Sequence, residues 1–187
     1  MTYRLIRSRR RTLALEIRGG ELIVRAPLRA TRAEIEQLLT QKRSWIEKHL
    51  QMSKEKKARA EAVQPLTREE LEALADRALE VIPARVRYYA PLLGVQVRRI
   101  TIRNQRTRWG SCSAKGNLNF NCLLMLTPIE VIDSVVVHEL CHLIEMNHSE
   151  RFYREVYRVY PEYDRWHGWL REHQTELMAR LSPAPRC

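Results

Sequence analysis

The stretch VVVHELCHLIEMNHSERF, residues 135–152, combines three histidines and a glutamate with a run of apolar side chains. Burying an ionisable group costs free energy unless the group is paired, hydrogen-bonded or bound to a metal. The stretch therefore predicts that His138, Glu139, His142 and His148 share a partner that offsets this cost.

The spacing of these residues predicts a metal site on a helix. His138 and His142 are four residues apart, so they share one helix face and both can reach a zinc ion at about 2.0–2.1 Å. Glu139 is rotated by about 100° from His138, which suits contact with a water molecule rather than with the metal. This is the HExxH pattern of zinc peptidases. We expect His148 to become the third ligand if Asn147 ends the helix in the left-handed conformation.

The predicted site holds three ligands and one base, which leaves a position on the metal open and favours catalysis over a structural role. Zinc lowers the pKa of a water molecule to about 7 and polarises a carbonyl group, and Glu139 would be the general base. The candidates for stabilising the reacting oxygen are Arg106, Arg108, Tyr163 and His167. Two alternatives stay open: core histidines with satisfied hydrogen bonds, and another divalent metal in place of zinc.

Charge is distributed unevenly along this chain of 187 residues, whose formal net charge is +11. Residues 1–64 hold 16 Lys/Arg against 7 Asp/Glu, and residues 81–129 hold no acidic side chain. This pattern predicts nucleic acid or another polyanion as a partner, through the basic N-terminal part and a basic loop. The alternative is a basic surface that only improves solubility.

The sequence gives no sign of a membrane segment. It contains no run of about 18 apolar residues, and its basic start lacks the apolar core of a secretory signal. We therefore expect a cytoplasmic location with reduced cysteines and no membrane partner.

Residues 1–60 are expected to form a basic subdomain of one hairpin and a helix. Apolar and polar residues alternate on both sides of Gly19-Gly20, the pattern of a two-residue hairpin. Thr31 and Glu34 predict a capping box, and apolar residues follow at helical spacing as far as residue 50. The charged residues 53–65 are predicted to link the two parts.

Residues 65–181 are expected to form an α+β core in which a small sheet packs on the histidine helix. A second capping box opens a helix that Pro83 kinks or ends. Two strands, 95–103 and 117–121, flank an irregular basic loop. Thr127 and Pro128 are expected to open the histidine helix, and two further helices follow before a loose tail, residues 182–187.

Three segments together resemble the bacterial YgjP-like metallopeptidase family: TRWGSCSAKGNLNFN (107–121), the stretch quoted above, and YPEYDRWHGWL (160–170). More distant relatives include the SprT-like and WLM proteases. The resemblance implies a zincin-like α+β fold, one zinc ion bound by His138, His142 and His148, and Glu139 as the catalytic base.

The resemblance also indicates where a peptide would bind, because zincins commonly hold an extended substrate on a sheet edge beside the metal helix. Residues 116–121 are the matching strand, with Asn117 and Asn119 as substrate-binding candidates. The alternative is a half-buried strand with Leu118 and Phe120 turned inward.

These features are compatible with three functions. The first is a zinc metallopeptidase that hydrolyses peptide bonds through a metal-activated water molecule. The second is a nucleic-acid-binding module with a structural metal site, and the third is a protease recruited to DNA.

Overall fold

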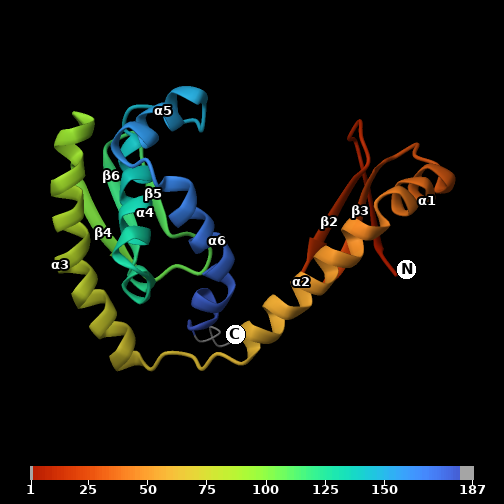
Figure 1. Cartoon of the computed structure of the whole chain (residues 1–187), viewed down its shortest axis with the longest axis horizontal. Helices are drawn as coiled ribbons and strands as arrows, with labels where there is room; N and C mark the ends of the chain where they lie inside the picture. The colour runs from red at the N-terminus through yellow and green to blue at the C-terminus, as the bar shows by residue number, and fades with distance from the viewer. Residues whose placement is uncertain (1, 182–187) are drawn as a thin grey trace. The chain divides into compact units, whose positions relative to one another are not determined.

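The computed structural model describes residues 2–181 and has α+β architecture, as predicted. Two compact units make up the chain, Met1–Val63 and Gln64–Cys187, drawn in Figure 1 from red to orange and from yellow to blue. The expected tail, residues 182–187, lies outside the described residues.

The N-terminal unit contains a three-stranded sheet in the order β1-β3-β2. Its strands are β1 (Arg4–Ser8), β2 (Ala14–Arg18) and β3 (Glu21–Pro27). Strand β3 pairs in parallel with β1 and antiparallel with β2. Gly19 and Gly20 form the turn between β2 and β3 with φ values of 60° and 85°, which favour glycine. The predicted hairpin is confirmed.

Two helices complete this unit, α1 (Arg32–Gln41) and α2 (Arg43–Glu61). The predicted capping box of Thr31 and Glu34 is present at the start of α1. The prediction of one unbroken helix is wrong, since the backbone leaves helical geometry at Lys42. The linker predicted over residues 53–65 is wrong in its first part, because α2 continues to Glu61 with its charged side chains in solvent.

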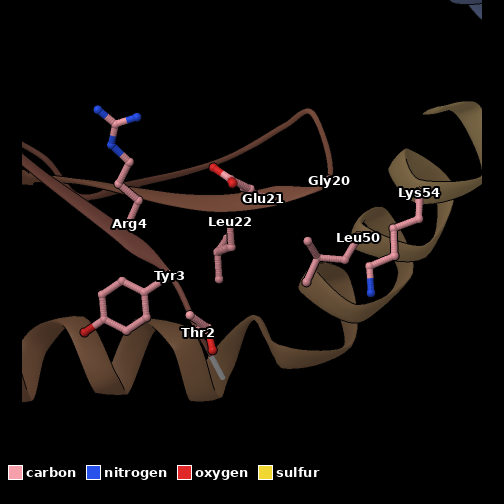
Figure 2. A pocket seen from close by; sticks show the side chains of 8 residues that line it. All are labelled: Thr2, Tyr3, Arg4, Gly20, Glu21, Leu22, Leu50 and Lys54. Atoms are coloured by element: carbon pink, nitrogen blue, oxygen red, sulfur yellow. The ribbon is translucent and has the colours of Figure 1, made fainter. Parts of the chain in front are cut away.

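The core of the N-terminal unit is small. Its main buried cluster consists of Val24, Ala26 and Ile35. A pocket of about 390 Å³ lies between the sheet and α2. Figure 2 shows the residues that line it, which are Thr2, Tyr3, Arg4, Gly20, Glu21, Leu22, Leu50 and Lys54. The sheet and α2 are therefore incompletely packed against each other at this end.

The C-terminal unit begins with the 26-residue helix α3 (Arg68–Leu93), capped by Thr67 as predicted. Helix α3 does not end at Pro83, one of the two predicted outcomes, since it runs through both Pro83 and Pro91. A proline frees the carbonyl four residues earlier. Those residues are Leu79 and Arg87, both exposed, so water can bind the freed carbonyls.

The second sheet has the strand order β4-β6-β5. Its strands are β4 (Arg99–Arg103), β5 (Gly110–Cys112) and β6 (Asn117–Asn121). Strand β6 pairs in parallel with β4 and antiparallel with β5. The prediction that residues 116–121 form a sheet edge is therefore wrong, because β6 has a neighbour on each side. Strand β5, which lies inside the predicted irregular loop, is an edge of this sheet instead.

The remaining elements are a 3₁₀ turn and three helices: η1 (Cys122–Leu126), α4 (Ile129–Cys141), α5 (Glu150–Val159) and α6 (Tyr163–Ala179). Helix α4 carries the first histidines and lies beside the sheet and α6 (Figure 1). The predicted Thr127 cap is wrong, because Pro128 is the N-cap and the Thr127 hydroxyl donates a hydrogen bond to the carbonyl of Leu124.

The core of the C-terminal unit surrounds α4, whose residues from Val131 to Val137 are buried. Leu118 and Phe120 point into this core, as the alternating pattern of β6 predicted. Within residues 2–181, no helix is both long enough and apolar enough to cross a membrane.

Candidate metal-binding active site

Three histidines converge at the C-terminal end of α4. His138 lies on α4, His142 caps its end, and His148 lies in the turn before α5. The Nε2 atom of His138 is 3.2 Å from Nε2 of His142 and 3.1 Å from Nε2 of His148. One ligand nitrogen from each ring lies within 4.8 Å of the others. This donor set fits one metal ion held by three imidazoles, with zinc among the metals that favour imidazole ligands.

The turn that brings His148 to this point differs from the predicted one. Among the described residues only glycines have a positive φ, so the prediction of a left-handed Asn147 is wrong. Tight turns end α4 instead, with bonds from the Leu143 and Ile144 amides to carbonyls three residues earlier. Ser149 then caps α5 and receives a hydrogen bond from the Phe152 amide.

Phe152 forms the apolar floor of the histidine cluster, a role that the sequence prediction missed. Its side chain is completely buried, and its ring centroid is 5.0, 4.7 and 4.8 Å from those of His138, His142 and His148. A single aromatic ring therefore restricts the orientation of all three imidazoles. The available signal was its spacing of four residues from Val156, which places both apolar side chains on one face of α5.

The outer nitrogens of two histidines have hydrogen-bond partners. Nδ1 of His138 lies 2.8 Å from the Tyr163 hydroxyl, which in turn lies 3.1 Å from Nδ1 of His167. Nδ1 of His142 lies 3.2 Å from the carbonyl oxygen of Glu145. These contacts leave both Nε2 atoms directed at the centre of the cluster. Tyr163 is only 2% exposed, so it lies behind the histidines rather than facing solvent.

Burial favours neutral imidazoles at this site. Burial, together with the neighbouring His142 and His148, lowers the pKa of His138 to about 3. Burial also lowers the pKa of His142. Neutral rings are the form that binds a metal.

Glu139 is buried beside the cluster, with 5% of its surface exposed. Burial raises the pKa of its carboxyl group to about 8, and the charge of Arg108 acts in the opposite direction. The side chain extends towards β5, where it packs against Gly110. The carboxylate is thus placed between the histidine helix and an edge of the sheet.

Of the two predicted arginines, Arg108 lies close enough to Glu139 for its charge to lower the pKa of the carboxyl group. Asn121, a residue that the sequence prediction did not select, anchors the basic loop by donating hydrogen bonds to the carbonyls of Gln105 and Arg108. Arg108 is exposed and acts on Glu139. Arg106 lies exposed in the same loop.

The two predicted asparagines lie on the central strand β6 and not on an edge. Asn119 donates a hydrogen bond from its side-chain amide to the Ser111 hydroxyl at 3.1 Å. The Asn117 backbone amide donates to the Ser113 hydroxyl. Both residues therefore support the arrangement of β5 and its following turn.

The chain matches a protein-family model described as the YgjP-like metallopeptidase domain over residues 11–74 and 64–173. A solved structure, the metallopeptidase zymogen abylysin of Pyrococcus abyssi, is similar at 24% identity with a TM-score of 0.45. That similarity covers 54% of this chain and 99% of the other. No curated protein matches the chain.

Proposed function

The chain belongs to the YgjP-like metallopeptidase family, and from this premise we propose that it hydrolyses peptide bonds at the three-histidine site with Glu139 as the general base. Membership makes the protein a metallopeptidase and hence a hydrolase. The observation that carries the residue assignment is the convergence of three Nε2 atoms at the end of the helix that also carries the buried Glu139.

His138, His142 and His148 are the proposed ligands of one zinc ion. When bound, zinc supplies Lewis-acid chemistry, polarising the substrate carbonyl and making water a better nucleophile at neutral pH. With Nε2 of His138 turned inward, its Nδ1–H donates to the Tyr163 oxygen, and the Tyr163 hydroxyl donates to Nδ1 of His167. Tyr163 and His167 therefore orient a ligand ring in this proposal, whereas the sequence predicts them as candidates for stabilising the reacting oxygen.

The proposed role of Glu139 is to transfer a proton from water to the leaving group. Its carboxylate accepts a proton from the attacking water molecule and donates it to the leaving amine. Burial excludes bulk water from this carboxylate, which strengthens its interaction with a charge that develops beside it. Arg108 is the proposed second electrophile, since it is exposed in the loop next to Glu139 while the Tyr163 hydroxyl is engaged by two histidines.

The proposed substrate is an extended segment of a peptide or protein. Strand β5 offers a free edge beside α4, so a peptide can add to it as a further strand and present a carbonyl near Glu139. This assignment moves the substrate contact from β6 to β5. The cytoplasm is the proposed location of the reaction, which cell fractionation would test.

The test is the Glu139→Gln variant, measured for bound metal and for cleavage of an unstructured protein. We expect metal binding to persist and hydrolysis to fall by at least about a hundredfold, the range for loss of a general base. Glu150→Gln is the matched control, because Glu150 is an exposed glutamate at the start of α5. Equal cleavage by the metal-loaded wild type and Glu139→Gln would refute the assigned base.

A second candidate function, recruitment to nucleic acid, is favoured by one polar face of the C-terminal sheet. Strand alternation places Ile100 and Ile102 in the core and the residues between and beside them on the opposite face. That face carries Arg99, Thr101, Arg103, Asn117, Asn119 and Ser111. Among the described strand residues of this face there is no carboxylate and no large apolar side chain, which suits phosphate contacts better than a protein interface with an apolar centre.

Binding to single-stranded DNA at several salt concentrations tests this candidate. Counterion release predicts that affinity falls steeply as salt rises. Replacing Arg99 and Arg103 by alanine should reduce the slope of log affinity against log salt by about 1.4, if each contacts one phosphate of the single strand. Arg68→Ala is the control, because Arg68 is paired with Glu72 on the exposed surface of α3. No binding at low salt would exclude the candidate.

A further inference from the structure

Gly110, the first residue of β5, lies directly against the carboxylate of Glu139. A Cβ atom built on Gly110 would be 2.5 Å from Oε1 of Glu139, 2.7 Å from its Cγ and 2.8 Å from its Cδ. Carbon atoms in van der Waals contact are about 3.5–4.0 Å apart. Even the smallest side chain at position 110 therefore requires Glu139 to move.

Neither partner can withdraw easily. Gly110 is in register with Phe120 of the central strand, and the neighbouring Trp109 carbonyl accepts a 2.8 Å hydrogen bond from the Asn121 amide. Phe120 and Asn121 are buried, so β5 is fixed from behind. Glu139 is buried on α4, where it has little solvent space into which its carboxylate could turn.

The backbone conformation does not explain this glycine. Gly19, Gly20, Gly94 and Gly116 all have positive φ values, which favour glycine in turns and at a helix end. Gly110 has no such value and sits in a strand. The requirement for glycine at this position arises from the space that Glu139 occupies.

We propose that Gly110 is a positioning residue for the general base. By leaving room for the Glu139 side chain, it allows β5 to pack against the carboxylate and to hold it in one orientation beside the histidine cluster. The inference rests on the proposed role of Glu139. It adds that the strand proposed to hold the substrate also fixes the base, so that one residue sets the distance between the two.

The first experiment compares Gly110→Ala with Gly168→Ala in the metal-loaded full chain. We expect Gly110→Ala to lower kcat by about a hundredfold, because a displacement of about 1 Å in a catalytic group has that effect. Metal affinity and KM should stay near the wild-type values, since the ligands and the free edge of β5 are retained. Gly168 lies on α6 with nothing within 4 Å of an added Cβ, so its variant should keep the wild-type kcat.

The second experiment tests the contact without using activity. Gly110→Ala should lower the thermal unfolding midpoint, and adding Glu139→Ala should restore it, because that substitution removes the atoms that the new Cβ would meet. Glu139→Ala alone is the reference. A double variant no more stable than Gly110→Ala would overturn the proposal, even if the single variant folds poorly.

The two proposals fail in different ways. A metal-loaded wild type without peptidase activity would refute the proposed function, whereas an active wild type matched in kcat by Gly110→Ala would refute only the role of Gly110. A rise in KM at unchanged kcat would also overturn it, since the glycine would then act on substrate binding.

Discussion

The two units of the chain differ in whether they bury carboxylates. In the N-terminal unit the ion pairs lie in solvent, as between Arg43 and Glu47 on α2. In the C-terminal unit two carboxylates, Asp133 and Glu139, are buried. Exposed pairs contribute little to stability, whereas a buried charge requires a partner or a function. Both units thus carry exposed ion pairs, but among the described residues the C-terminal unit also places two carboxylates in its interior.

Asp133 and Glu139 also differ from each other. Asp133 receives two hydrogen bonds from the Arg85 guanidinium and one from the Tyr89 hydroxyl, which joins α4 to α3. Glu139 has instead the raised pKa of a buried acid. One buried carboxylate therefore joins α4 to α3, and the other is the one proposed for proton transfer.

The largest expected effect is that of metal loading, which should stabilise only the C-terminal unit. A ligand present at a thousand times its Kd adds about 4 kcal/mol to the stability of the state that binds it. We expect zinc to slow amide hydrogen exchange in α4 and α5 and to leave α2 unchanged. Equal protection of α2 would show that the two units unfold together.

The second-largest expected effect compares how much a buried ion pair and an exposed ion pair contribute to the free energy of unfolding. Asp133→Asn should destabilise the C-terminal unit by about 3 kcal/mol, the lower end of the range for breaking a buried pair, because Arg85 keeps 29% of its side chain exposed. Arg43→Ala is the control in the N-terminal unit and should change stability by less than about 0.5 kcal/mol. Denaturant unfolding measures both values. Similar losses would mean that burial does not separate the two kinds of pair.

The smallest expected effect compares two tyrosine hydroxyls of the same unit, one buried and one exposed. It tests whether burial determines how much each hydroxyl contributes to metal affinity. Tyr163→Phe removes the hydroxyl behind His138 and should weaken metal affinity by about 10–100-fold, as is typical for groups that orient a metal ligand. Tyr157→Phe is the control in the same unit, because that hydroxyl bonds the exposed Asp164. Competition with a chelator measures both affinities. Equal losses would remove Tyr163 from the metal site.

The sequence predicted the elements with strong local signals. The hairpin at Gly19-Gly20 and the capping boxes at Thr31 and Thr67 depend on a few neighbouring residues, and all three are present. The histidine cluster was also predictable as a group, because helical spacing brings His138 and His142 together. Assignment of these residues to metal binding and catalysis stays a proposal.

The errors concern features that depend on tertiary contacts. Strand β5 has the weak strand sequence Gly-Ser-Cys and forms through pairing with β6, so local propensity could not reveal it. Pro83 is tolerated because α3 packs along α4 and η1. Lys42 is an ordinary helix former, and nothing in its neighbourhood signals the break between α1 and α2. The role proposed for Gly110 could not be predicted from the sequence, because only the fold brings Glu139 against this residue.

The three-residue length of β5 has a consequence for the behaviour of the protein at high concentration. A free strand edge is a template on which copies of a chain can aggregate, and short or charged edges reduce that hazard. Strand β5 offers only three residues, and the other outer strand of the sheet begins and ends with arginine. Neither edge supports a long intermolecular ladder, so the sheet can remain open to a peptide without promoting fibril growth.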